Sequence, residues 1–101
     1  SVHSRLFDTV KKDWIRILGN NKEKLQTELK ESKILSDLLS KATREDLSKE
    51  ELKTVKTQLG DLAKTIPSFA LFLLPGGSLV LPVVIKLIPN LLPSAFQTNV
   101  L

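Results

Sequence analysis

The apolar segment of residues 66–93 restricts what this chain can fold into more than any other part of it; its sequence is IPSFALFLLPGGSLVLPVVIKLIPNLLP. Leu, Ile, Val and Phe dominate the segment, yet it contains all five prolines of the sequence and a Gly76-Gly77 pair. Such an apolar surface is unfavourable in water, and the prolines and glycines interrupt any long continuous helix. The segment therefore has to bend inside a lipid bilayer or be buried by partner helices.

Charge is divided unevenly along the chain. All 11 acidic residues and 14 of the 15 basic residues precede residue 67, and Lys86 is the one charge in the rest of the sequence. The net charge of +4 is modest, and both signs alternate, as in Lys22-Glu23-Lys24, where a nucleic-acid-binding protein typically has a dense cationic run. DNA is therefore not an expected partner. With no cysteine, the chain has neither disulfides nor thiol chemistry.

Residues 1–47 are predicted to form charged amphipathic helices. In the first helix, apolar residues recur at helical spacing until Gly19-Asn20-Asn21 ends it, at Leu6, Val10, Trp14 and Ile17 or Leu18. A second helix is expected from Lys22 to about Ser40, and its weakly patterned middle predicts a break near Ser32.

Residues 48–101 are predicted to form one structural unit that begins with a long kinked helix. Ser48 is a favourable N-cap because Glu51 follows three residues later, as a capping box requires. The helix is expected to run from about Lys49 to Leu74 with a kink at Pro67. Its apolar stripe crosses that proline without interruption, at Leu52, Val55, Leu59, Leu62, Ile66, Phe69 and Leu73.

A turn at Pro75-Gly76-Gly77-Ser78 is expected to end this helix. The second apolar helix would then cover residues 79–88, with Pro82 in its first turn and Pro89-Asn90 as its end. The predicted fold class is therefore all-α, with amphipathic helices, a long kinked helix and an apolar helical hairpin broken by proline and glycine.

Each arm of this hairpin would be about 14–15 Å long, which is half the thickness of a bilayer. A hairpin that dips into a membrane and a hairpin buried in a soluble helical bundle both fit that length. In a membrane, the Lys- and Arg-rich N-terminal part should stay on the cytoplasmic side. Lys86 would then sense protons or pair with an acid of another subunit, or simply extend to the membrane surface.

The sequence contains no constellation typical of an enzyme. His3 alone makes neither a catalytic triad nor a metal site. The acidic pairs Glu45-Asp46 and Glu50-Glu51 are typical of helix starts. No Gly-Lys-Ser/Thr follows Gly76-Gly77, so these glycines predict a turn and no phosphate loop. We therefore expect a non-enzymatic protein with no catalytic residues, cofactor or metal.

Two runs, FLLPGGSLVLP at residues 72–82 and IKLIPNLLPSAF at residues 85–96, resemble the leucine-zipper and EF-hand-containing transmembrane protein family, and in particular its bacterial members. The resemblance covers about residues 48–96. Its signature, which we interpret as structural, consists of Pro75, Gly76, Gly77, Pro82, Lys86, Pro89, Pro93, Ser94 and Phe96.

The resemblance implies a membrane-associated protein of cation/proton homeostasis, or a scaffold for ribosomes and membrane proteins, and some bacterial relatives carry a biofilm-associated label. It also implies that a ribosome-binding domain would follow residue 96. The chain departs from the family because it has no EF-hand loop and no long leucine zipper. Membrane lipid or partner helices are the expected partners, the ribosome is a partner by resemblance alone, and a homo-oligomer is compatible with the sequence. The alternative function is a soluble helical interaction module whose apolar hairpin is buried core, with a cytoplasmic location.

Overall fold

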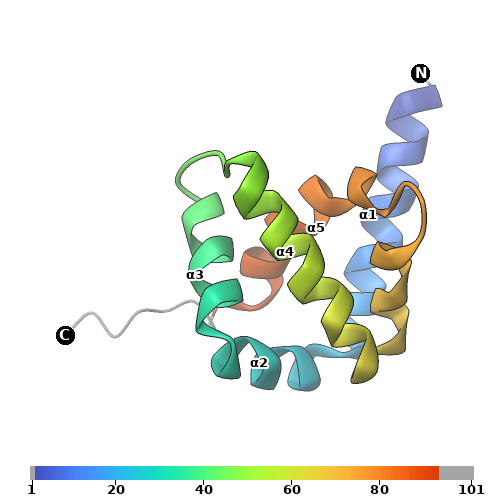
Figure 1. The fold of residues 1–101 in the computed structure, drawn as a ribbon. Coiled ribbons are helices and arrows are strands. Elements are labelled where there is room, and N and C mark those ends of the chain that lie inside the picture. Colours follow the sequence, from blue (N-terminus) through green and yellow to red (C-terminus); the bar gives the residue numbers. More distant parts are fainter. Residues whose placement is uncertain (1, 94–101) are drawn as a thin grey trace.

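The computed structural model describes residues 2–93, and all regular secondary structure within this range is helical (Figure 1). The α-helices are α1 (Val2–Asn20), α2 (Lys22–Glu31), α3 (Lys33–Ala42), α4 (Lys49–Asp61) and α5 (Leu81–Leu91). Between α4 and α5 lie the 3₁₀ helices η1 (Leu62–Lys64), η2 (Pro67–Leu73) and η3 (Gly77–Leu79). The all-α prediction is confirmed.

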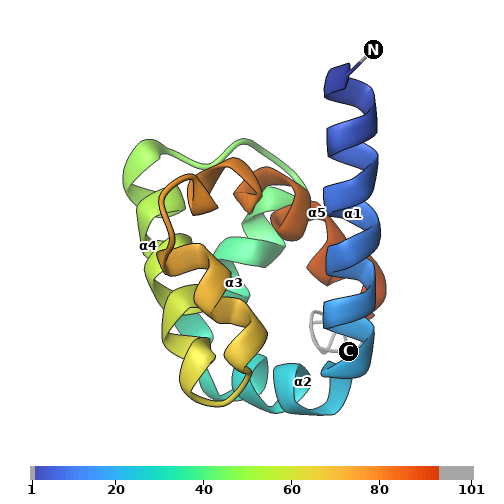
Figure 2. The same ribbon diagram turned by 90° about the vertical axis from the view of Figure 1, so that its right-hand side faces the viewer.

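The two apolar arms are packed against the charged helices. Helix α5 contacts α1 and α3, whereas η2 contacts α4 and η1 (Figures 1 and 2). The N-terminal half of α1 extends beyond the rest of the fold in both views. The chain does turn at the glycines, but the expected hairpin of two paired helices is replaced by two separate packing partners, because each arm covers a different apolar face of the amphipathic helices.

The predicted break near Ser32 is confirmed, since α2 ends at Glu31 and α3 begins at Lys33. Ser32 has an extended backbone with φ −106° and ψ 92°, and its hydroxyl accepts a hydrogen bond from the Leu35 N–H. A serine in this conformation satisfies one of the free donors at the start of α3. The sequence therefore marks the break with an N-cap residue.

The long kinked helix to Leu74 was a wrong prediction. Helix α4 ends at Asp61, and Ile66 adopts an extended backbone with φ −123° and ψ 91° before Pro67 begins η2. The ring of a proline disfavours the α conformation of the residue before it, so the helix ends where a kink was expected. In η2, residues three apart lie above one another, which places Phe69 and Phe72 on one face, and this face is buried together with the preceding Ile66.

The predicted end of the second apolar helix at Pro89-Asn90 was also wrong, because α5 continues through Pro89 to Leu91. Pro89 lies in the last turn, where a missing N–H costs one hydrogen bond only, and the Leu92 N–H still donates to the Ile88 carbonyl over 2.9 Å. The position of Pro82 in the first turn of α5 is confirmed.

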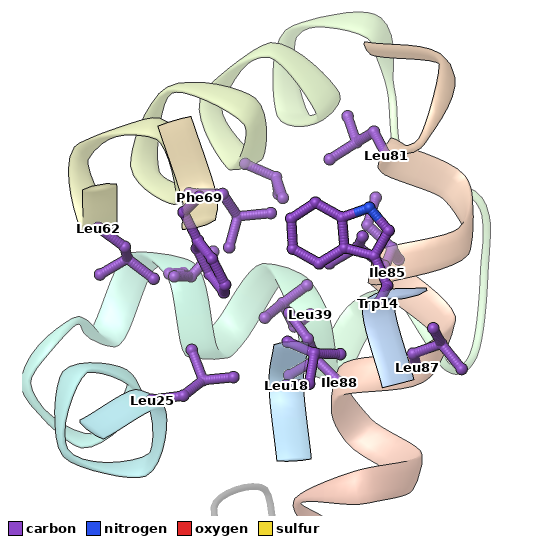
Figure 3. Close-up of a cluster of buried hydrophobic side chains, with 14 of the residues drawn as sticks. Trp14, Leu18, Leu25, Leu39, Leu62, Phe69, Leu81, Ile85, Leu87 and Ile88 are labelled. Carbon is purple, nitrogen blue, oxygen red and sulfur yellow. The ribbon is translucent and has the colours of Figure 1, made fainter. Parts of the chain in front are cut away.

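The apolar segment supplies much of the hydrophobic core, and no polar side chain of the described residues is buried. Figure 3 shows the side chains of α1, η2 and α5 meeting in the interior. No described helix is both long enough and apolar enough to cross a membrane. The buried residues are Trp14, Leu18, Leu25, Leu29, Leu35, Leu39, Val55, Leu59, Leu62, Ile66, Phe69, Phe72, Leu81, Val83, Val84, Ile85, Leu87, Ile88 and Leu92.

Candidate interaction surfaces

The turn at Pro75, Gly76 and Gly77 requires both of its glycines. Gly76 has a φ of +84°, a conformation that residues with a Cβ rarely adopt. Gly77 is buried, and a Cβ on it would lie 2.6 Å from the Leu71 carbonyl oxygen and 2.9 Å from the Phe72 Cα. These signature residues therefore shape the backbone that joins η2 to α5, and they present no chemistry of their own.

The signature residues of α5 point away from the core. Pro82 and Lys86 are exposed and Pro89 is half-buried, and their spacing of four and three residues places them on one face of the helix. Pro93 is exposed just after α5. Ser94 and Phe96 lie outside the described residues. This arrangement exposes Lys86 on the protein surface.

A pocket of about 300 Å³ lies beside Lys86, between α5 and the connection from α3 to α4. Ala42, Leu47, Leu52 and Ile85 make it apolar, whereas Glu45 and Asp46 carry charge at its edge. Within residues 2–93, no acidic side chain lies within ion-pair distance of Lys86. The sequence did not predict this pocket, because residues about 40 positions apart line it.

The other two faces of η2 are exposed and mostly apolar. One face carries Pro67, Ala70 and Leu73, and the other carries Ser68, Leu71 and Leu74. Large apolar side chains remain strongly exposed here and at the end of η3, with exposed fractions of 44% for Leu71, 70% for Leu73, 56% for Leu74 and 81% for Leu79. We call these four leucines the exposed leucine cluster. Such a cluster on a small domain is typical of an interaction surface.

A groove of about 360 Å³ lies between η2 and α1. Leu71 and Leu74 line one side, and Arg16 and Ile17 line the other. Arg16 also pairs with Asp13 over 3.6 Å, but both side chains are largely exposed, so this ion pair holds Arg16 weakly. The groove therefore places a guanidinium group next to an apolar surface.

Two rows of basic residues follow from helical spacing. On α1, Arg5, Lys12 and Arg16 are exposed and lie within about 40° of one another around the axis, since residues 11 and 4 positions apart return to nearly the same direction. We call these residues the α1 basic row. The second row, on α4, consists of Lys49, Lys53 and Lys56 and is called the α4 basic row. Sequence analysis missed both rows because acidic residues interrupt them along the chain.

The start of α4 is fixed to the end of α3 by charge. The Glu51 carboxylate accepts hydrogen bonds from the Ser48 N–H (2.8 Å) and the Lys41 ammonium (2.6 Å), and the Glu51 N–H donates to the Ser48 hydroxyl (3.1 Å). The predicted capping box is thus confirmed. The hydrogen bond from Lys41, followed by that from Ser48, lowers the pKa of Glu51, and the bond to Glu51 raises the pKa of Lys41.

The acidic pairs make contacts typical of helix ends. Glu45 pairs with Lys41 over 3.7 Å, and Glu50 lies exposed in the first turn of α4. Among residues 2–93, no group of three or more His, Asp or Glu side chains is placed to hold a metal ion. The side chain of His3 is not among those described.

Comparison with protein families matches residues 47–100 to the profile described as "LETM1-like, RBD". The matched range contains α4, the exposed leucine cluster and α5. The prediction that a ribosome-binding domain would begin only after residue 96 was therefore wrong, since the profile of that domain covers these residues themselves. No solved structure matches the chain.

Two curated fungal proteins are similar to the chain. "LETM1 domain-containing protein mdm28, mitochondrial" of Schizosaccharomyces pombe is 37% identical over 68 residues, which are 66% of this chain and 14% of that protein. "LETM1 domain-containing protein YLH47, mitochondrial" of Saccharomyces cerevisiae is 37% identical over 70 residues, which are 68% of this chain and 15% of that protein. The chain thus spans about one-seventh of the length of these relatives. With more than half of its residues in the family profile, the chain belongs to the LETM1-like family.

Proposed function

We propose that this chain is a non-enzymatic, membrane-associated scaffold of the LETM1-like family that contacts the ribosome. The observation that carries the proposal is the match of residues 47–100 to the profile described as an RBD. Both fungal relatives are named as mitochondrial proteins, which supports a place at an organelle membrane or an equivalent bacterial one. Cation/proton homeostasis and a biofilm role stay predictions, because the chain spans so little of its relatives.

The α4 basic row is the proposed contact with ribosomal RNA. Lys49 and Lys53 are exposed, Lys56 is half-buried, and all three belong to the part of the chain that matches the family profile. A row of lysines along one helix face can follow a nucleic-acid backbone and release its counterions. Binding through phosphates would depend strongly on salt and weakly on RNA sequence.

Co-sedimentation with purified ribosomes tests this proposal. The protein is centrifuged through a sucrose cushion with bacterial ribosomes and, in parallel, with yeast mitochondrial ribosomes, at several salt concentrations. We expect wild type to pellet with at least one of them, and we expect the triple variant Lys49→Glu, Lys53→Glu and Lys56→Glu to bind at least tenfold more weakly with a shallower salt dependence.

The matched control reverses the charge of three exposed lysines of α2 by substitution with glutamate. These are Lys22, Lys24 and Lys30, which lie outside the range that matches the family profile. This variant changes the net charge of the protein by the same amount, so it should retain most of the binding if position matters. Wild type that stays in the supernatant with both kinds of ribosome refutes ribosome binding. An equal loss in both triple variants refutes the α4 basic row as the contact.

A helical interaction module whose apolar segment is buried core is the second candidate function. It is favoured by the burial of Ile66, Phe69, Phe72 and most of α5 in the described fold. The two candidates differ in membrane association, which cell fractionation at physiological ionic strength without a carbonate wash measures. A chain found entirely in the fraction that does not sediment with membranes supports the second candidate.

A further inference from the structure

The exposed leucine cluster and the α1 basic row adjoin at Arg16. Arg16 belongs to the α1 basic row and lines the same groove as Leu71 of η2 and Leu74, the residue that follows η2. In Figure 1, η2, in gold, overlaps the C-terminal half of α1, and Figure 2 shows a gap between the two ribbons, across which Trp14 contacts Phe72. We call the combined surface the α1–η2 face; it consists of Arg5, Lys12, Arg16, Leu71, Leu73, Leu74 and Leu79.

The chemistry of this face is divided into an apolar part and a cationic part. No charged residue occurs between Lys64 and Lys86, so the whole stretch of η2, the turn and η3 is free of charge. The cations come from a separate helix: Arg16 lies at the side of the apolar part, and Lys12 and Arg5 continue the row towards the start of α1. Interfacial membrane-binding elements have this division, with apolar side chains next to basic residues that contact anionic headgroups.

We infer that the α1–η2 face binds the surface of an anionic lipid bilayer. The leucines of η2 and η3 enter the boundary between headgroups and acyl chains, and Arg5, Lys12 and Arg16 bind the lipid phosphates. The fold stays intact in this arrangement, and no helix crosses the bilayer. The inference rests on the membrane part of the proposed function and adds to it which face of the chain meets the lipid.

Two features of the face favour lipid over a protein partner. The exposed leucine cluster flanks the turn at Gly76 in the sequence, and Ser68 is the one exposed side chain of η2 that can form hydrogen bonds. Protein interfaces carry about one hydrogen bond per 100–200 Å², whereas the exposed faces of η2 offer one hydroxyl group. Guanidinium and ammonium groups, in contrast, match phosphates at the adjoining basic row.

Flotation with large unilamellar vesicles tests the inference. The vesicles contain phosphatidylcholine and phosphatidylglycerol in a ratio of 70 to 30, and a second set contains phosphatidylcholine alone. We expect wild type to float with the anionic vesicles and to bind the neutral ones at least tenfold more weakly. The double variant Leu74→Asp and Leu79→Asp should lower the partition coefficient for anionic vesicles at least tenfold.

Two control variants separate the face from general effects of charge. Ile34→Asp places an acid on α3, where Ile34 is 59% exposed, and should bind nearly as well as wild type. The variant Arg5→Gln, Lys12→Gln and Arg16→Gln should bind several-fold more weakly than its charge-matched control, Lys22→Gln, Lys24→Gln and Lys30→Gln. Far-UV circular dichroism and thermal unfolding confirm that each variant is folded.

The outcomes distinguish this inference from the proposed function. If the double variant Leu74→Asp and Leu79→Asp floats as well as wild type, the α1–η2 face is contradicted, but membrane association still stands. Wild type that never floats overturns both the inference and the proposed membrane association, whereas ribosome binding is measured independently by co-sedimentation.

A dimer in sedimentation velocity that the Leu→Asp changes dissociate would assign the leucines to a second copy. Glutamine variants that lose ribosome binding but keep vesicle binding would assign the α1 basic row to RNA. Either of these two results overturns the inference.

Discussion

The indole of Trp14 lies against the ring of Phe72, with 4.9 Å between the ring centroids and an interplanar angle of 38°. Phe69 completes the group, with its centroid 5.4 Å from that of Trp14 and an interplanar angle of 66°. Trp14 comes from the charged helix α1, and both phenylalanines come from the apolar 3₁₀ helix η2; Figure 3 labels Trp14 and Phe69. This contact therefore joins the two chemically different parts of the sequence into one core.

Replacing Trp14 by alanine should destabilise the fold by about 3–5 kcal/mol, because it leaves a cavity beside both phenylalanines. Urea unfolding followed by far-UV circular dichroism measures the free energy of unfolding without the lost tryptophan signal. Ile34→Ala is the control, since Ile34 is exposed and should change stability by no more than about 0.5 kcal/mol. Similar values for the two variants would contradict the packing of α1 on η2.

Two glycine-to-alanine substitutions should have opposite effects. At Gly77 the new methyl group meets the backbone of Leu71 and Phe72, so Gly77→Ala should destabilise the fold by about 1–3 kcal/mol. At Gly19, near the end of α1, the added Cβ has no atom within 4 Å apart from its chain neighbours and the backbone of its own helix, and alanine is the better helix former by up to about 1 kcal/mol. Thermal unfolding of both variants measures the difference. A stabilised Gly77→Ala protein would show that the turn is not packed as described.

Lys86 should be dispensable for folding even though it lies in the most apolar helix. Because its side chain is exposed, Lys86→Leu should change the free energy of unfolding by no more than about 0.5 kcal/mol. Val84→Asp on the same helix places a charge in the core and should cost several kcal/mol. Chemical unfolding of the two variants in parallel checks the orientation of α5. A large loss in Lys86→Leu would mean that this lysine has a structural partner.

The ion pair at the start of α4 predicts an acid-sensitive contribution to stability. The pKa of Glu51 is lowered in the folded state by Lys41 and Ser48, so unfolding raises this pKa towards its ordinary value. The unfolded chain then binds the proton more readily. The contribution of Glu51 to the free energy of unfolding is fully present above the pKa that Glu51 has in the unfolded chain. It disappears as the pH falls through the lower pKa that Glu51 has in the folded protein.

Comparison of wild type with Glu51→Gln between pH 7 and pH 2 measures this contribution. The difference in unfolding free energy should be constant near neutral pH and shrink in the acid range. The control Glu50→Gln removes the neighbouring carboxylate, which is exposed and takes no part in the capping box. A difference that grows as the pH falls would contradict the lowered pKa.

The sequence alone determined the features that depend on a few neighbouring residues. The capping box of Ser48 and Glu51 closes through hydrogen bonds three residues apart, and the N-cap at Ser32 works in the same way. The turn at Gly76 follows from a backbone conformation that other residues avoid. Family membership could likewise be anticipated from the prolines and Lys86 of the apolar segment, because their spacing is itself a sequence pattern.

The tertiary structure decided which apolar residues are buried. Helical spacing predicted Ile66, Phe69 and Leu73 on one face, whereas the fold buries Ile66, Phe69 and Phe72 and leaves Leu73 exposed. The order of apolar residues is compatible with both α and 3₁₀ spacing, so contacts with Trp14 and α4 select between them. Pro89 is tolerated inside α5 for a related reason, since the burial of Ile88 and Leu92 offsets one lost hydrogen bond. Burial depends on partners distant in sequence, and a local pattern does not contain them.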